Sequence, residues 1–253
     1  MRQHFLTFCA IAAVMTPAAA LAQPRRIVLQ GVIDEPGRYM LSTDIRVGSS
    51  PGVGILITAS GVDLDLSGAS ISGPGGIQGT AIHVRNAAGV TIRNGKFANL
   101  QLGITVEDRA NVTIRDCQFR GEGLIPAAMP ETALMILQSR NVVVEGNSIY
   151  STGLGICVRG GRSFGNRISN NTITGGMGFA ALGICYNPAP GDPLGPRGDL
   201  ISNTLTTNYP TSIQMNPTSA ANVITGNTLV FLVEGVTTKS TNTDMDNVKS
   251  KLP

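Results

Sequence analysis

The sequence predicts an all-β fold, namely a parallel β-helix in which a single chain winds through about seven coils. The octapeptide VTIRNGKF at residues 90–97 returns as VTIRDCQF at residues 112–119, which indicates a structural repeat. Each repeat offers short alternating apolar strands and no helical pattern, and the Leu-rich consensus of leucine-rich repeats is missing. One register position gains Asn in the later repeats and keeps it, at Asn147, Asn171, Asn203 and Asn227.

Later copies of the octapeptide drift in sequence but keep its frame, at residues 142–149, 166–173, 198–205 and 222–229. A second short strand precedes each copy, with inward residues Ile82, Ile104, Leu134, Ile156, Ile184 and Ile213. Equivalent positions in neighbouring coils lie roughly 4.8 Å apart, the spacing of paired strands. We therefore expect one inward row of Ile92, Ile114, Val144, Ile168, Leu200 and Ile224. A second inward row is expected from Phe97, Phe119, Ile149, Ile173, Leu205 and Leu229.

The repeated Asn indicates a ladder of buried side-chain amides at the corner between two strands. An amide both donates and accepts hydrogen bonds, so stacked Asn side chains can satisfy backbone groups that an apolar corner would leave unpaired. Such a ladder supports the architecture and carries no information about catalysis. Cys117 occupies the same register one coil earlier, where we expect a buried, unpaired thiol.

Residues 1–22 are typical of a secretory signal peptide, with Arg2 near the start, an apolar run over residues 6–14 and an Ala-Leu-Ala cleavage box at residues 20–22. The mature chain is expected to begin near Gln23. No later stretch is long and apolar enough to span a bilayer. We therefore expect a periplasmic or secreted protein with no membrane span in its mature form.

Removing that segment takes away Arg2 and leaves 18 basic residues (19 less one) against 16 acidic ones, a net charge near +2. This charge is too mild for nucleic-acid binding, which needs a concentrated basic face. The 31 Gly and the absence of Trp fit short strands joined by tight turns. We expect an N-terminal cap at residues 23–51, one β-helix domain at residues 52–238 and a polar C-terminal tail at residues 239–253. The cap is needed because the first coil would otherwise expose an unpaired sheet edge.

Four short motifs near the start of the mature chain carry a family resemblance: PGxYxL at residues 36–41, GIxI at 54–57, VxLDLxG at 62–68 and ISG at 71–73. They resemble the opening of bacterial right-handed parallel β-helix repeat proteins, which are relatives of the pectin-lyase superfamily. The resemblance covers nearly the whole mature chain and implies the fold and a right-handed coil. It implies no single function, because the superfamily holds polysaccharide lyases, hydrolases and epimerases beside proteins with no known activity.

Insertions at residues 120–132, 174–182 and 187–198 break the regular spacing of the repeats, and the last of them is rich in Pro and Gly. All three border the sheet that begins each coil. Loops added beside one sheet of a solenoid usually form the walls of a binding groove. Neutral drift is the alternative, since insertions in turns cost little. We expect a groove on this sheet.

The residues that alternate with the inward aliphatic residues of this sheet are expected to point to solvent. The first outward row is His83, Thr105, Met135, Cys157, Cys185 and Gln214, and the second is Arg85, Glu107, Leu137, Arg159, Asn187 and Asn216. A lone outward His is more often a solvated strand residue than a catalyst, but the neighbours of His83 make it the best available acid or base. We expect a catalytic set of His83, Glu107 and Arg159. Substrate binding is expected from Arg85, Thr105, Arg159, Asn187, Gln214 and Asn216.

The sequence lacks the catalytic motifs that the resemblance would imply. Glycoside hydrolysis needs two carboxylates about 5–10 Å apart, and Glu107 has no partner carboxylate on its own face. Pectate lyases hold calcium with clustered acidic residues and use Arg as a base; Arg85 and Arg159 could supply that Arg, but the acidic cluster is missing. We predict no metal site and no cofactor, because the mature chain's single His, three Cys and dispersed carboxylates form no ligand set. The neighbouring sheet is expected to present Asp65, Arg93, Arg115, Glu145, Arg167 and Asp199.

Cys157 and Cys185 fall in the same register on consecutive coils. Their Cα atoms should lie about 5 Å apart, a separation that a disulfide accepts. Export to an oxidising compartment would permit the bond, whereas side chains that point the same way can also remain two parallel thiols. Both alternatives stay open at this point.

Two function hypotheses follow from the sequence. The first is an exported protein that binds an acidic polysaccharide along the groove, and in its catalytic version processes it, with Arg85 and Arg159 pairing sugar carboxylates bidentately. The second is a non-catalytic structural or surface solenoid module, such as a spacer, an adhesin or an assembly component. A cleft in which His83, Arg85, Glu107 and Arg159 converge would favour the first hypothesis.

Overall fold

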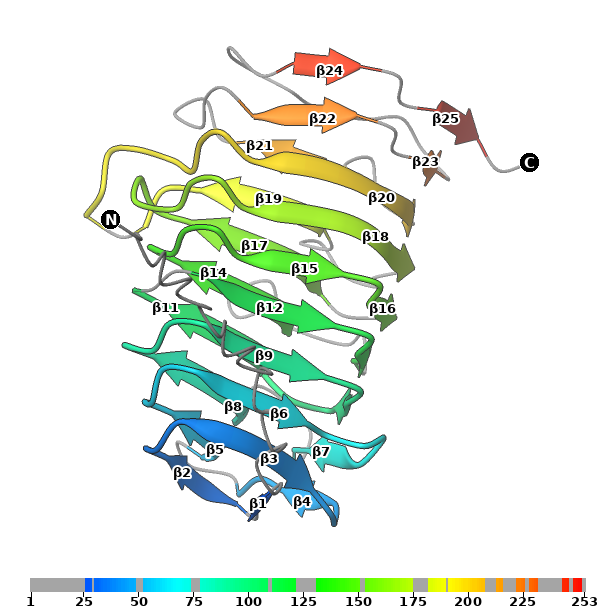
Figure 1. Cartoon of the computed structure of the whole chain (residues 1–253). Coiled ribbons are helices and arrows are strands. Elements are labelled where there is room, and N and C mark those ends of the chain that lie inside the picture. The colour runs from blue at the N-terminus through cyan, green and yellow to red at the C-terminus, as the bar shows by residue number, and fades with distance from the viewer. Residues whose placement is uncertain are drawn as a thin grey trace, which may run out of the picture.

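The computed structural model describes the strands and turns of most of the chain. The described residues are 26–28, 30–48, 52–73, 78–108, 111–121, 131–150, 153–174, 182–189, 191–207, 213–215, 222–225, 228–231, 243–245 and 248–251. Their strands stack as successive parallel coils from β1 at one end to β25 at the other (Figure 1). The chain is a right-handed parallel β-helix, as the sequence predicts.

One side of the solenoid is an eight-stranded parallel sheet to which each coil adds one strand. Its strands are β2 (Gly31–Ile33), β5 (Val53–Ile57), β8 (Thr80–Arg85), β11 (Leu102–Glu107), β14 (Thr132–Leu137), β17 (Leu154–Arg159), β19 (Leu182–Asn187) and β21 (Ile213–Met215). The predicted inward row of this sheet is confirmed, because its members pair in register and are fully buried. They are Ile82, Ile104, Leu134, Ile156, Ile184 and Ile213, and the structure extends the row to Ile55 of β5.

The rest of each coil belongs to a 17-stranded parallel sheet that bends into two rows. The first row contains β1 (Arg26–Val28), β3 (Gly37–Leu41), β6 (Val62–Asp65), β9 (Val90–Arg93), β12 (Val112–Arg115), β15 (Val143–Glu145), β18 (Arg167–Thr174), β20 (Leu200–Thr207), β22 (Val223–Thr225) and β24 (Thr243–Met245). The second row contains β4 (Ile45–Arg46), β7 (Ser70–Ser72), β10 (Lys96–Ala98), β13 (Gln118–Arg120), β16 (Ser148–Tyr150), β23 (Thr228–Phe231) and β25 (Val248–Lys251). Strands β18 and β20 run through the bend and pair with strands of both rows.

The inward rows of the 17-stranded sheet are confirmed apart from one position. The row that begins with Phe97 and Phe119 pairs as predicted, and these two rings stack with their centroids 4.7 Å apart. In the other row, Ile168 pairs with Ile201. The expectation for Leu200 is therefore wrong by one residue. The reason is a register shift, since β20 has one residue fewer than β18 at the bend between the rows.

The bend between the two rows is tight because one residue of the early coils adopts a left-handed backbone conformation. Its φ is 60° at Asn94, 56° at Asp116, 65° at Gly146 and 57° at Asn170. Asn, Asp and Gly tolerate this region better than other residues, which explains why the sequence uses them here.

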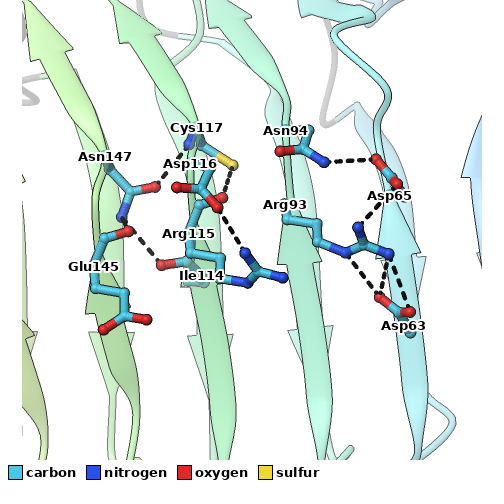
Figure 2. Close-up of polar contacts among 10 residues, drawn as sticks. All are labelled: Asp63, Asp65, Arg93, Asn94, Ile114, Arg115, Asp116, Cys117, Glu145 and Asn147. Carbon is cyan, nitrogen blue, oxygen red and sulfur yellow. Dashed lines mark hydrogen bonds and ion pairs between the residues drawn. The ribbon is translucent and has the colours of Figure 1, made fainter.

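The residue after this bend carries the ladder of amides that the sequence predicts, and we call it the amide ladder. Asn171 Oδ1 accepts hydrogen bonds from the backbone N and the Nδ2 of Asn147, at 3.0 and 2.9 Å. Asn203 Oδ1 accepts the same pair of bonds from Asn171, at 3.0 and 2.8 Å. The backbone N of Cys117 donates to Asn147 Oδ1 at 3.0 Å (Figure 2). Asn227 lies outside the described residues.

A second buried ladder, which the sequence analysis missed, follows the corner between the two sheets; we call it the mixed ladder. The backbone N of Val142 donates to Asn166 Oδ1 at 2.9 Å. The backbone N and Nδ2 of Asn166 donate to the two carboxylate oxygens of Asp199, at 2.8 and 3.1 Å, and the backbone N of Asp199 donates to Asn222 Oδ1 at 2.9 Å. Asp199 is only 1% exposed, so the expectation that it faces outward is wrong. It stands at the corner before β20, where side chains turn inward.

Strands also occur in the segments expected to cap the solenoid and to form its tail. Strands β2, β3 and β4 pair in parallel with β5, β6 and β7, so residues 31–46 form a coil of the same kind. Strands β24 and β25 pair with β22 and β23. The expected signal peptide at residues 1–22 lies outside the described residues. Within the described part of the chain, no helix has the length and apolar character needed to cross a membrane.

Candidate functional site

His83 and Glu107 lie on the outer side of the eight-stranded sheet, in β8 and β11. Their neighbours in each strand are inward and fully buried, so strand alternation turns these two side chains outward. The register pairs His83 with Thr105 and Arg85 with Glu107, which makes His83 and Glu107 diagonal neighbours. His83 Nε2 lies 2.9 Å from Glu107 Oε2. We call this contact the His83–Glu107 pair.

Arg85 completes the group beside the His83–Glu107 pair. Its Nε lies 3.8 Å from Glu107 Oε2, and its side chain is 60% exposed, against 22% for His83 and 28% for Glu107. When His83 Nε2 carries the proton and donates a hydrogen bond to Glu107, Nδ1 is the nitrogen that can accept a proton from a ligand. The arrangement can therefore perform general acid–base chemistry next to a solvent-accessible guanidinium group that can pair with an anion.

Arg159 lies on the same outward row but apart from the His83–Glu107 pair. The row runs through Arg85, Glu107, Leu137, Arg159 and Asn187. Two strand spacings, roughly 10 Å, therefore separate Glu107 from Arg159. Arg159 Nε is buried and has no hydrogen-bond partner among the described residues. The structure thus brings together His83, Glu107 and Arg85 and leaves Arg159 beside Asn187.

The other outward row is not open to solvent along its whole length. The expectation that Thr105, Cys157 and Cys185 face solvent is wrong, because they are 7%, 0% and 1% exposed. The two cysteines form a disulfide across β17 and β19, with Cα atoms 4.7 Å apart. Thr105 lies in register between His83 and Met135, whose side chains flank it.

The remaining predicted site residues occupy the far end of the sheet. Gln214 pairs in register with Cys185 through its backbone, but its side chain is outside the described part of the structure. Asn216 also lies outside the described residues. The free thiol of Cys117 is buried, and burial raises its pKa to about 12. It therefore stays protonated at neutral pH and is a poor nucleophile.

The outer face of the 17-stranded sheet carries a cluster in which opposite charges neutralise one another. Arg93 donates from Nε and Nη2 to the two oxygens of Asp63, both at 3.2 Å, and its Nη1 lies 3.0 Å from Asp65 Oδ2 (Figure 2). Asn94 Nδ2 also donates to Asp65 at 3.0 Å, and Asp65 is buried instead of standing free on this face. The Arg93 side chain is only 15% exposed, and these contacts raise its pKa, chiefly through the hydrogen bonds that it donates to Asp63. This cluster stabilises neighbouring coils and offers little free charge to a ligand.

A cleft lies at the corner where the chain leaves the eight-stranded sheet, and we call it the corner cleft. It consists of two adjoining hollows of about 530 and 630 Å³. Its lining includes Asp108, Gln138, Arg140, Arg162, Phe164 and Arg197. Of the three insertions expected to wall a groove, the one at residues 187–198 contributes Asp192 and Leu194 to this cleft. Residues 122–130 and 175–181 of the other two lie outside the described ranges.

The corner cleft was not predicted from the sequence, although the sequence contains one signal of it. Arg140, Phe164 and Arg197 each stand two residues before the corner position held by Val142, Asn166 and Asp199. Their equivalence becomes visible only when that register is known, and the structure shows it directly in the bridges Arg140–Phe164 and Phe164–Arg197.

No cluster of three or more His, Cys, Asp or Glu side chains in the described part of the chain could hold a metal ion. The described side chains likewise give no reason to assign a cofactor.

Comparison with known proteins identifies the class of fold. Residues 53–229 match the family described as "Right handed beta helix region", so the chain belongs to this family. No curated protein sequence matches the chain significantly. Among solved structures, an alginate lyase from Paenibacillus sp. str. FPU-7 is similar, with a TM-score of 0.59, 12% identity and coverage of 93% of both chains. A tailspike protein of E. coli bacteriophage HK620 in complex with a pentasaccharide matches 85% of this chain and 43% of its own, with 10% identity and a TM-score of 0.42. At these identities the likeness is one of fold.

Proposed function

We propose that this protein binds an acidic polysaccharide on the outer face of the eight-stranded sheet and processes it there. The observation that carries the proposal is the 2.9 Å contact between His83 and Glu107, with the exposed guanidinium of Arg85 beside it. A sugar acid presents a carboxylate for Arg85 and a weakly acidic C–H bond next to that carboxylate. The similarity in fold to an alginate lyase makes alginate the first polymer to test.

The geometry favours proton abstraction over hydrolysis. Hydrolysis needs two carboxylates on either side of the bond, and Glu107 is the only carboxylate among the described side chains of the two outward rows. In the proposed reaction, His83 Nδ1 takes the proton next to the uronate carboxylate while Glu107 holds the imidazole and Arg85 stabilises the negative charge. Elimination would be completed when the bond to the neighbouring glycosidic oxygen breaks and that oxygen takes a proton from water, and epimerisation when water delivers a proton to the opposite face of the carbanion.

The test incubates the protein with alginate and with polygalacturonate, and measures both binding and product. Elimination gives an unsaturated sugar that absorbs ultraviolet light, and epimerisation in heavy water incorporates deuterium at the abstracted position. His83→Ala should lower turnover roughly 100-fold or more, the usual contribution of a general base. Arg46→Ala, which removes an exposed arginine of β4 elsewhere on the solenoid, should leave turnover unchanged.

Two outcomes would change this assignment. Binding without turnover, unaffected by His83→Ala, would reduce the proposal to a carbohydrate-binding protein. Failure to bind either acidic polymer would contradict the proposal and favour the structural solenoid module.

We further propose that the protein is exported. Residues 1–22 have the pattern of a signal peptide, and the Cys157–Cys185 disulfide suits an oxidising compartment. Mass spectrometry of protein from periplasmic and culture fractions should find a chain beginning near Gln23 with this disulfide intact. A chain that keeps the expected signal peptide and stays in the cytoplasm would contradict export.

A further inference from the structure

The outer wall of the corner cleft is held to the coils beneath it by hydrogen bonds. Asp192, from the insertion at residues 187–198, accepts hydrogen bonds from Gln138 Nε2 at 3.1 Å and from the backbone N of Gly161 at 2.9 Å. The backbone N of Leu194 donates to its other oxygen at 2.9 Å. Gln138 Oε1 in turn accepts from the backbone N of Arg162 at 3.0 Å. The inserted loop is thus held to the turns of two earlier coils.

Arginine side chains and one aromatic ring line this cleft. Arg140, Phe164 and Arg197 occupy equivalent positions on three successive coils, so they form a row with steps of roughly 4.8 Å. The guanidinium of Arg140 lies 5.9 Å from the centre of the Phe164 ring, which is 40% exposed. Arg162 also lines the cleft. Among the described residues, no carboxylate lies within ion-pair distance of Arg140, Arg162 or Arg197.

We propose that the corner cleft is a binding subsite for a carboxylated sugar chain, in which Arg140 and Arg197 pair sugar carboxylates and Phe164 packs against a pyranose ring. This inference rests on the proposed function and extends it to a second place on the surface. Arg pairs with carboxylates through two parallel hydrogen bonds, and aromatic rings offer a flat apolar face to the C–H groups of a sugar. A row of arginine, aromatic ring and arginine therefore matches a polymer that repeats an anionic ring.

The position of the cleft connects it to the His83–Glu107 pair. Asp108 directly follows Glu107, and Gln138 follows Leu137, so the cleft begins where the second outward row ends. A chain held in the corner cleft could continue onto that row. The subsite would then hold a part of the polymer that does not react.

The acidic side chains of the cleft argue for a sugar over a nucleic acid. Asp108 lines the same hollows as the three arginines, and Asp192 forms the wall. These carboxylates repel any anionic group, but sugar hydroxyl groups can donate hydrogen bonds to them, whereas a phosphodiester backbone has no donor for them. The ligand expected here therefore carries both carboxylates and hydroxyl groups.

The test measures the affinity of the full chain for alginate oligosaccharides by calorimetry at low and high salt. The double variant Arg140→Ala/Arg197→Ala should weaken binding at least tenfold, since a hydrogen bond to a charged group is worth about one decade or more. Salt should weaken wild-type binding more than binding by the variant. Phe164→Leu should weaken binding severalfold, while Arg46→Ala should bind as wild type does. A neutral cello-oligosaccharide of the same length should bind poorly to all of them.

The outcomes separate this inference from the proposed function. If the double variant binds as tightly as wild type while Arg85→Ala binds weakly, the inference is overturned and the proposed function stands. If a single-stranded oligonucleotide binds more tightly than the oligouronate, charge alone explains the cleft and the sugar assignment is overturned. If the double variant loses binding to short oligosaccharides but His83→Ala keeps it, the subsite is supported whether or not turnover is found. Melting curves check that each variant is folded.

Discussion

The amide ladder and the mixed ladder both supply acceptors for buried backbone N–H groups at corners of the solenoid, but the side chains that accept differ in charge. In the amide ladder each of Asn147, Asn171 and Asn203 accepts and donates through a neutral side chain. In the mixed ladder a carboxylate, Asp199, stands between Asn166 and Asn222. A carboxylate accepts hydrogen bonds well but carries a charge that burial penalises.

A buried corner can therefore have its hydrogen bonds satisfied and still contribute a stability that depends on pH. Burial raises the pKa of Asp199 from 3.8 to about 6, although hydrogen bonds from the backbone N and Nδ2 of Asn166 oppose the rise. A raised pKa in the folded state means that the contribution of Asp199 to stability is fully present below pH 3.8. That contribution is lost as the pH rises through about 6. The amide ladder has no such group and should not respond to pH in this range.

The largest effect is expected when the amide ladder is broken in its middle. Asn171→Ala leaves the buried backbone N of Asn147 without its acceptor and the carbonyl oxygen of Val144 without the Nδ2 donor of Asn171. Each such group costs roughly 1–3 kcal/mol, so for two groups the free energy of unfolding should fall by about 4 kcal/mol. Urea unfolding measures it, with the exposed neighbour Thr172→Ala as the matched control. A loss no greater than that of the control would show that the ladder does not hold the corner.

A smaller and opposite effect is expected in the mixed ladder. Asp199→Asn keeps an acceptor for Asn166 and removes the buried charge. The variant should match wild type near pH 4 and exceed its unfolding free energy by roughly 3 kcal/mol near pH 8, the free-energy equivalent of the shift from 3.8 to about 6. Melting temperatures at several pH values give the difference curve. A difference that does not change with pH between 4 and 8 would refute the assignment of a raised pKa.

The smallest effect is expected when a ladder is lengthened. Cys117 already donates its backbone N to Asn147, so an Asn at this position would add one more amide to the stack. Cys117→Asn should change the free energy of unfolding by less than about 1 kcal/mol, because the new polar group gains partners. Val112→Asn is the contrast. Val112 is fully buried on the coil before Val142, so an Asn there would not touch Asn166 and should cost more. Equal losses of unfolding free energy in the two variants would mean that hydrogen bonds to the ladder do not offset the cost of burying the Asn side chain.

The repeat determined most of the fold before any coordinates were known. A recurring octapeptide frame with alternating apolar positions leaves one way to stack the strands, and the inward rows of Ile82 and Phe97 pair as predicted. The error at Leu200 arose where the spacing itself changed by one residue. Periodicity has no means of choosing between two registers at such a point, because both bring an aliphatic residue near the row. The structure adopts the register that buries Ile201 and keeps Asn203 in the amide ladder.

The candidate site was determined only in part by the sequence. Strand alternation and register were enough to expect that His83, Arg85 and Glu107 share a face, because these depend on local geometry that the repeat fixes. The burial of Cys157 and Cys185, and the corner cleft around Arg140 and Phe164, depend on how turns of unequal length pack against one another. The sequence alone therefore determined which residues stack. The tertiary structure decided which of them reach solvent, because exposure depends on the path of every neighbouring turn.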